Sequence, residues 1–277
     1  MRYVRSIAVC VTVFVLLGGF LFWNNFVIQT EETKITLESL PEAFNDLRIV
    51  LLTDLHGREF ERDNSYLLQQ VRAAAPELIC VSGDLFDLQT EMGDIYLLLS
   101  QLTIIAPTYY VTGNHEWQVD DLPSVLQRME QCGVTVLRNE YVILRRGDER
   151  LILAGVDDPC GPKDQKSPEE LVRQIRAAEG EDACIVMLCH RNDGLETWAQ
   201  LGVDLVLSGH CHGGVVRLPY VGGVFGTKRE LFPAFSAGLY RENSTQLYVS
   251  RGLGYTNVRL RLFNRPHLPV LRLVNNS

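Results

Sequence analysis

The chain has 277 residues, of which 46% are hydrophobic and 22% charged, and its formal net charge is −8. This composition is typical of a globular protein with a sizeable core. An acidic chain lacks the positive charge that marks nucleic-acid-binding proteins, so its charge argues against a nucleic-acid substrate.

The amino-terminal segment departs from that average. Residues from Ser6 to Trp23 carry no charge, and a run of this length is about the shortest that spans a bilayer as a helix. No small-x-small cleavage site follows Trp23, which favours an uncleaved transmembrane signal anchor over residues 1–24. A cleaved signal peptide is the alternative.

Charges beside the span predict its orientation. Arg2 and Arg5 precede it, and only Lys34 follows it closely. The positive-inside rule therefore places the amino terminus in the cytoplasm and the rest of the chain on the extracytoplasmic face. The seven cysteines show no paired spacing and several lie in strand-like runs, as expected for buried free thiols. Free thiols also suit a domain that faces the cytoplasm, which is the alternative topology.

Beyond the anchor, we expect residues 25–46 to form a tether and an edge strand near residues 34–37. Residues 47–277 then form one domain of about 230 residues. Strand-like and helix-like runs alternate in its first half, which predicts parallel strands with helices covering the sheet. The strand-like runs are residues 47–52, 78–81 and 108–111, and the helix-like runs are 64–75, 92–102 and 121–132.

The second half adds a hairpin around Arg146-Gly147-Asp148-Glu149 and a helix that opens with the capping box Ser167-Pro168-Glu169-Glu170. Further strands are predicted at 184–188 and 204–207, with a short helix at 195–201 between them. After Val215 the pattern is mostly β, with strands at 246–250 and 268–274. The predicted fold is α/β, a layered α/β/β/α sandwich of two mixed sheets flanked by helices.

Metal-binding types of residue follow five of the apolar strands. Ligands collect at the carboxyl ends of strands in α/β folds, so these segments can meet in one crevice. Taken singly, each segment also fits a helix cap, a turn or a solvated histidine, but five in succession favour a common site. The segments are Asp54-Leu55-His56, Gly83-Asp84-Leu85-Phe86-Asp87, Gly113-Asn114-His115-Glu116, Cys189-His190 and Gly209-His210-Cys211-His212.

The order of these motifs resembles the calcineurin-like metallophosphoesterases over about residues 47–214. The carboxy-terminal segment from Val249 to Gly254, with Arg259 and Pro266, is also similar to a membrane-anchored branch of that family, near the UDP-2,3-diacylglucosamine pyrophosphohydrolase-like proteins. The resemblance implies two metal ions with Asp84 bridging them. It implies that one ion is held by Asp54, His56 and His212, and the other by Asn114, His190 and His210.

Carboxylates and imidazoles together suit Mn²⁺, and Fe or Zn²⁺ as alternatives, rather than a calcium cage or a thiolate zinc site. Two such ions about 3.5–4 Å apart can hold a bridging hydroxide and bind the phosphoryl oxygens for in-line attack. The resemblance implies that His115 is catalytic, either stabilising charge or protonating the leaving oxygen, and that Asp87 orients His115. Asp87 as a helix cap is the alternative, and Glu116 is expected to support the site or cap a helix.

Two positions depart from the family pattern. Cys211 stands where threonine is common, and we expect its thiol to pack as a small apolar group, although a thiol near iron can also ligate or oxidise. His267 stands where an acidic residue is more usual, and we expect it at the surface.

These features predict a membrane-anchored phosphoesterase that cleaves a phosphodiester or pyrophosphate bond, with the bilayer and a phosphate-ester substrate, lipid-linked or nucleotide-linked, as partners. Apolar residues of the carboxy-terminal half are candidate acyl contacts. Alternatives are a phosphodiesterase of soluble nucleotides and a tethered protein that binds metal without catalysis. The candidate acyl contacts are Phe225, Leu231, Phe232, Phe235 and Leu239.

Overall fold

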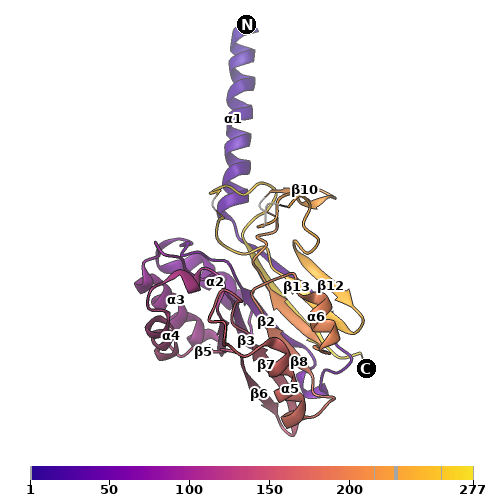
Figure 1. Cartoon of the computed structure of the whole chain (residues 1–277). Helices are drawn as coiled ribbons and strands as arrows, with labels where there is room; N and C mark the ends of the chain where they lie inside the picture. Colours follow the sequence, from indigo (N-terminus) through magenta and orange to yellow (C-terminus); the bar gives the residue numbers. More distant parts are fainter. Residues whose placement is uncertain (1, 215, 228–229, 257, 277) are drawn as a thin grey trace.

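The computed structural model describes residues 2–214, 216–227, 230–256 and 258–276. Two six-stranded sheets face each other, and helices cover the outer face of each, as Figure 1 shows. The predicted α/β/β/α sandwich of two mixed sheets is therefore confirmed.

The first sheet has the strand order β1-β14-β2-β3-β4-β5. Strands β2 to β5 are parallel and are joined by helices, as the alternating pattern predicts. Strand β14 runs antiparallel to β2 and parallel to β1, which forms the sheet edge. The strands are β1 (Gln29–Thr36), β2 (Leu47–Leu52), β3 (Leu78–Ser82), β4 (Thr108–Val111), β5 (Thr135–Val136) and β14 (His267–Val274), and the helices are α2 (Ser65–Ala73), α3 (Met92–Ile105) and α4 (Leu122–Gln131).

The second sheet has the order β12-β13-β9-β8-β7-β6, with the predicted hairpin formed by β6 and β7. The capping box is present, since Ser167 and Glu170 exchange side-chain-to-backbone hydrogen bonds at the start of α5. The strands are β6 (Glu140–Arg146), β7 (Glu149–Gly155), β8 (Ile185–Leu188), β9 (Leu205–Ser208), β12 (Gly238–Glu242) and β13 (Thr245–Val249), and the helices are α5 (Pro168–Glu179) and α6 (Leu195–Gln200). Short elements are η1 (Glu42–Phe44), η2 (Arg62–Asn64), η3 (Glu116–Gln118), β10 (Arg217–Leu218) and β11 (Gly222–Gly223).

Three apolar layers hold this sandwich together, and strand β2 illustrates how. Ile49 and Leu51 point into the layer between the two sheets, while Val50 and Leu52 point into the layer under α2, α3 and α4. A strand buried on both faces needs a continuous apolar run, because successive side chains alternate between faces. The third layer lies between the second sheet and helices α5 and α6.

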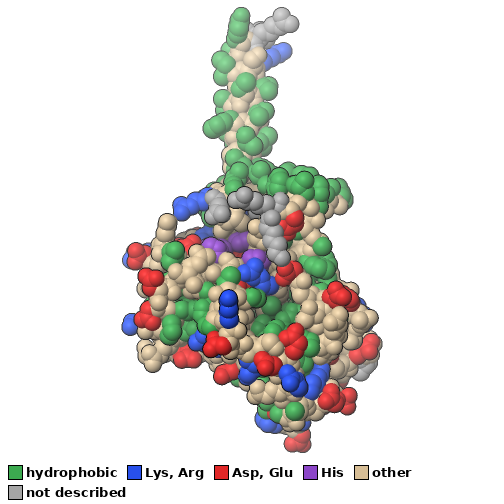
Figure 2. Space-filling model, in the orientation of Figure 1, with side chains coloured by type: hydrophobic (Ala, Val, Ile, Leu, Met, Phe, Trp, Pro, Cys, Tyr) green, Lys and Arg blue, Asp and Glu red, His purple; other side chains and the backbone are tan. Residues whose placement is uncertain are grey.

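Helix α1 (Arg2–Phe26) projects from the body of the protein (Figures 1 and 2). It is the one helix of the described residues that is long and apolar enough to cross a membrane. Its last turn is fixed to the domain, because the Asn25 amide donates to the Arg261 carbonyl at 3.2 Å and its oxygen accepts from the Arg261 N–H at 2.8 Å. Strand β1 starts at Gln29, almost directly after the helix, and Arg265 donates to the carbonyls of the two residues between them, Val27 and Ile28.

Replacing Asn25 with alanine removes both side-chain hydrogen bonds to Arg261. Each is worth about 1 kcal/mol, so we expect amide exchange at residues 261–264 to become about tenfold faster or more. Hydrogen exchange measured by mass spectrometry checks this. Gln127→Ala, an exposed position on α4, is the matched control, and unchanged exchange in Asn25→Ala would show that the helix end is not what holds this segment.

Candidate metal centre

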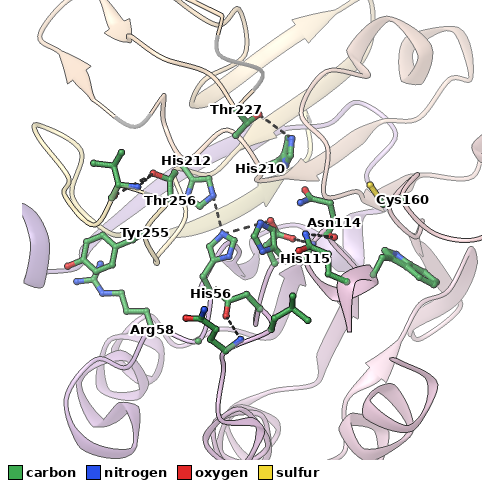
Figure 3. Close-up of a pocket in the computed structure, with 18 of the residues that line it drawn as sticks. His56, Arg58, Asn114, His115, Cys160, His210, His212, Thr227, Tyr255 and Thr256 are labelled. Carbon is green, nitrogen blue, oxygen red and sulfur yellow. Dashed lines mark hydrogen bonds and ion pairs between the residues drawn. The ribbon is translucent and has the colours of Figure 1, made fainter. Parts of the chain in front are cut away.

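The predicted ligand residues meet where the carboxyl ends of parallel strands from both sheets face each other (Figure 3). Each lies in the loop directly after its strand, so the buried strand fixes the position of its backbone. The first sheet contributes Asp54 and His56 after β2, Asp84 after β3, and Asn114 and His115 after β4, and the second contributes His190 after β8 and His210 and His212 after β9.

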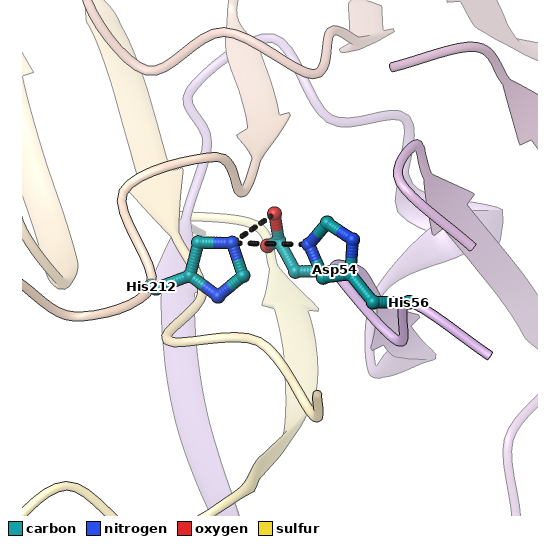
Figure 4. A group of neighbouring side chains, drawn as sticks. All are labelled: Asp54, His56 and His212. Carbon is teal, nitrogen blue, oxygen red and sulfur yellow. Dashed lines mark hydrogen bonds and ion pairs between the residues drawn. The ribbon is translucent and has the colours of Figure 1, made fainter. Parts of the chain in front are cut away.

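Asp54, His56 and His212 form one cluster, drawn in Figure 4. The Nε2 atoms of His56 and His212 are 3.2 Å apart, and His212 Nε2 lies 3.5 Å from Asp54 Oδ1. Three potential ligand atoms therefore point at one volume, as the predicted first ion requires.

Asp84, His190 and His210 form the second cluster. His190 Nε2 lies 3.2 Å from Asp84 Oδ2 and 3.0 Å from His210 Nδ1. Asp84 Oδ2 is also 3.8 Å from His56 Nε2, so this carboxylate lies between the two clusters, where a bridging ligand belongs.

The donor set fits two cations. In the neutral, metal-binding form of His190 the proton lies on Nδ1, 2.9 Å from the Ser82 carbonyl oxygen, which leaves a lone pair on Nε2 facing Asp84 and His210. Without a metal ion, a proton on Nε2 takes this place. Lone pairs that face lone pairs repel, and a positive ion between them removes the conflict. The buried side-chain oxygen of Asn114 has no hydrogen-bond partner among the described residues, as expected of a ligand oxygen.

The protonation states of the imidazoles also favour metal binding. Burial lowers the pKa of His56 to about 4 and that of His210 to about 3, and it holds the pKa of His212 well below its usual value. These three rings are therefore neutral at pH 7, the form that binds metal. Burial also opposes the charged form of His190, but the carboxylates of Asp84 and Asp54 outweigh it and raise its pKa to about 10, which marks the position where positive charge is favoured.

The loops that present these groups have unusual backbone geometry. Asp54, His56, Asp84, His210 and His212 all have φ between 49° and 67°, a left-handed conformation that is uncommon outside glycine. Such residues persist where the surrounding structure holds them and cluster at functional sites. In the turn around His210 and His212 the flanking Gly213 and Gly214 are left-handed as well, so histidines and glycines share this geometry.

Glu116 supports the backbone of the loops that carry the ligands, as predicted. It is fully buried, and its carboxylate accepts hydrogen bonds from the backbone N–H groups of Gly113 at 2.7 Å, Leu85 at 2.8 Å and Asp84 at 3.0 Å. It thereby joins the loops after β3 and β4. Burial raises the pKa of Glu116 to about 7.

His115 lies against His56, with ring centroids 4.6 Å apart in an edge-on arrangement, and it forms a third group of potential ligand atoms with His56 and Asp84. The orientation of His115 by Asp87 stays a prediction. The Asp87 carboxylate accepts hydrogen bonds from Gln89 N and Thr90 Oγ1, both at 3.1 Å, and so closes its own turn. This turn precedes α3, whose N-cap is Glu91, so Asp87 is not the helix cap of the alternative, and a catalytic role for His115 stays a prediction.

The two departures from the family pattern have different outcomes. Cys211 is buried and burial raises the pKa of its thiol to about 11, so the prediction of a small packed group is confirmed. The surface placement of His267 is wrong. His267 is buried beneath the edge of the first sheet, where its Nε2 lies 3.4 Å from Glu31 and its Nδ1 accepts from the Arg251 N–H. The buried thiols are as expected, with Cys80, Cys184 and Cys189 free and buried.

A cavity of about 1110 Å³ opens over both clusters (Figure 3). Its wall includes cationic and aromatic residues that the sequence analysis missed. Arg191 directly follows His190, and its side chain is held by Asp158 at 2.7 Å, so proximity to a ligand was an available signal. Arg58, two residues after His56, gave the same signal, and Arg259 entered only through the family resemblance. Thr227, Tyr255 and Thr256 had no such signal, because they lie well apart from the ligand motifs in the chain. None of the five candidate acyl contacts lines this cavity.

Residues 47–214 match the family model of the calcineurin-like phosphoesterases. The chain belongs to this family. It is 30% identical over 263 residues to an uncharacterized metallophosphoesterase of Helicobacter pylori, covering 91% of this chain and 67% of that protein. It is 29% identical to the phosphodiesterase YaeI of Escherichia coli, covering 82% of each chain.

A zebrafish transmembrane protein with a metallophosphoesterase domain is 29% identical, covering 86% of this chain and 55% of that protein. The chain thus spans about half the length of that relative and about two thirds of the H. pylori one. Relatives with these names and the apolar helix α1 indicate membrane association. Family membership makes this protein a metal-dependent phosphoesterase, a hydrolase of a family that uses two metal ions, and its ligand clusters could hold them.

Metal content tests the assignment of ligands. We expect the full chain, purified with excess Mn²⁺, to carry about two ions, His212→Ala to carry about one, and Asp84→Asn to carry one or fewer because the bridge is lost. Inductively coupled plasma mass spectrometry counts the ions. Cys211→Ser is the control and should keep both, since the protonated thiol is not a ligand. Loss of metal in the control, or two ions retained in His212→Ala, would contradict the assignment.

Proposed function

We propose that this protein hydrolyses a phosphodiester or pyrophosphate bond in a substrate held at a membrane surface, such as a phospholipid or a nucleotide-linked lipid. One observation carries the proposal. The segment between β13 and β14 lines the catalytic cavity through Tyr255, Thr256 and Arg259, and the same segment is bonded to the end of α1 through Arg261 and Asn25. The cavity therefore lies beside the base of the apolar helix.

Two divalent ions, Mn²⁺ in our proposal with Fe or Zn²⁺ as alternatives, would supply Lewis acidity to the phosphoryl oxygens and activate water. Asp54, His56 and His212 would hold one, Asn114, His190 and His210 the other, with Asp84 shared. Side chains of the cavity would bind the phosphate and stabilise or protonate the departing oxygen.

Arg191 binds the phosphate group in this proposal. Its guanidinium donates to both carboxylate oxygens of Asp158, at 2.7 and 3.0 Å, which fixes its plane at the cavity wall. Arg58 lies across the cavity and stacks on Tyr255, with its guanidinium 4.0 Å from the ring centroid. Two fixed cations suit a substrate with more than one phosphate oxygen exposed. His115 lies where it can stabilise charge on the departing oxygen or protonate it.

The orientation of the anchor completes the proposal. Arg2 and Arg5 precede the span, so the positive-inside rule places the amino terminus in the cytoplasm and the cavity at the extracytoplasmic leaflet. Protease accessibility of the domain in intact cells checks this, and protection from protease would support the cytoplasm-facing alternative.

Replacing His115 with alanine tests catalysis. We expect kcat for bis-p-nitrophenyl phosphate with Mn²⁺ to fall about 10²- to 10⁴-fold, because an acid–base or charge-stabilising group is lost, while metal content stays near that of the wild type. Asp120→Ala, an exposed change in the same loop region, is the control. Absence of hydrolysis by the wild type with any divalent metal would favour the alternative of a non-catalytic metal-binding protein.

The substrate class is tested with the full chain in phospholipid nanodiscs. Leu88 and Val258 are exposed apolar residues of the cavity wall, so we expect Leu88→Ser with Val258→Ser to reduce turnover of a lipid-linked pyrophosphate at least tenfold more than that of the chromogenic diester. Ile104→Ser, exposed on α3 away from the cavity, is the matched control. Equal losses on both substrates would contradict the lipid proposal, and faster turnover of soluble nucleotides would favour a nucleotide phosphodiesterase.

A further inference from the structure

A second cavity, of about 580 Å³, lies at the base of α1. It is separate from the catalytic cavity, since the two share no lining residue in the part of the chain that the structure describes. Helix α1, the β10–β11 ribbon and the segment before β14 form its wall (Figure 1). The residues that matter here are Trp23, Asn24, Arg217, Val221, Phe263 and Arg265.

The rim of this cavity is apolar and continuous with α1. Trp23, Val221, Phe263 and Tyr220 are all about half exposed or more, and Figure 2 shows hydrophobic side chains gathered around the base of the helix. Tryptophan, tyrosine and phenylalanine at the end of an apolar helix are typical of the membrane–water interface. If α1 spans the bilayer, this rim lies at headgroup level.

The cavity also contains a polar group without a partner. Asn24 is fully buried, and its amide nitrogen donates to the Phe20 carbonyl at 2.9 Å. Its side-chain oxygen has no hydrogen-bond partner among the described residues. Leaving a buried acceptor unsatisfied costs about 1–3 kcal/mol, so this position calls for a ligand that donates a hydrogen.

Two guanidinium groups add positive charge. Arg265 stacks on Trp23, with its guanidinium 4.4 Å from the ring, and donates to the carbonyls of Val27 and Ile28. Arg217 donates to the Gly213 carbonyl at 2.9 Å. Within the described residues, no carboxylate forms an ion pair with either arginine, so their charges are available to an anionic group.

We propose that this cavity binds the headgroup of a membrane phospholipid, with its phosphate at Arg217 and Arg265 and a headgroup N–H or O–H donated to Asn24. Ethanolamine satisfies Asn24 because its ammonium group carries N–H donors, whereas choline carries none. The apolar rim contacts the acyl chains. The site is independent of catalysis, so it stands or falls separately from the proposed substrate.

The test compares phosphatidylethanolamine with phosphatidylcholine, which share charge and phosphate and differ in N–H donors. The full chain is equilibrated in detergent with equal amounts of both, and retained lipid is counted by native mass spectrometry. We expect about tenfold preference for phosphatidylethanolamine, the effect of one hydrogen bond to a charged donor. Asn24→Leu should abolish the preference, and Arg217→Gln should weaken retention of both lipids. Arg62→Gln, an exposed arginine outside the cavity, should change neither.

Equal retention of the two lipids by the wild type would overturn the proposal without any variant. A preference that survives in Asn24→Leu, with circular dichroism and metal content as in the wild type, would overturn the role of Asn24. Soluble phosphoethanolamine that displaces the lipid at equal concentration would show a metabolite site rather than a lipid site. Supporting results are the wild-type preference together with its loss in Asn24→Leu.

Discussion

The buried carboxylate of Asp84 connects the two sheets at the metal centre. It lies 3.2 Å from His190 on the second sheet and 3.8 Å from His56 on the first, and the backbone of His210 donates to neighbouring Asp54 at 3.0 Å. Acidic groups buried without positive charge are costly, so bound cations would link the sheets as well as serve the reaction. Metal binding and the stability of the sandwich are therefore coupled.

The loops around this carboxylate contain strained left-handed residues, and close packing holds them in that conformation. Left-handed residues such as Asp84 and His212 each cost on the order of 1–3 kcal/mol. Glu116 offsets part of this by accepting hydrogen bonds from four backbone N–H groups. A side chain at Gly209 would collide with Thr53 and Asp54, so only glycine allows the loop after β9 to approach the loop after β2.

The sequence predicts features that depend on neighbouring residues, but it does not reveal contacts between residues far apart in the chain. Apolar runs that end in Asp, Asn or His could be read directly, because a buried strand and the residue after it are adjacent in the chain. His267 was placed at the surface because its cover, Glu31 on β1, is 236 residues away and pairs only through the parallel β1–β14 contact. The predicted role of Asp87 toward His115 rests on the family resemblance, and the contact that the structure shows is the local one to Thr90, three residues on.

The segment between β13 and β14 connects helix α1 to the loops of the metal centre. Its Leu253 and Gly254 N–H groups donate to the carbonyls of Thr53 and Asp54, and Arg261 bonds to Asn25 at the end of α1. A flexible tether would let the cavity sample many distances from a bilayer. Hydrogen bonds at both ends of this segment instead fix the cavity relative to the helix. In the proposed function, the fold rather than a linker therefore sets the distance between α1 and a phosphate bound at the metal centre.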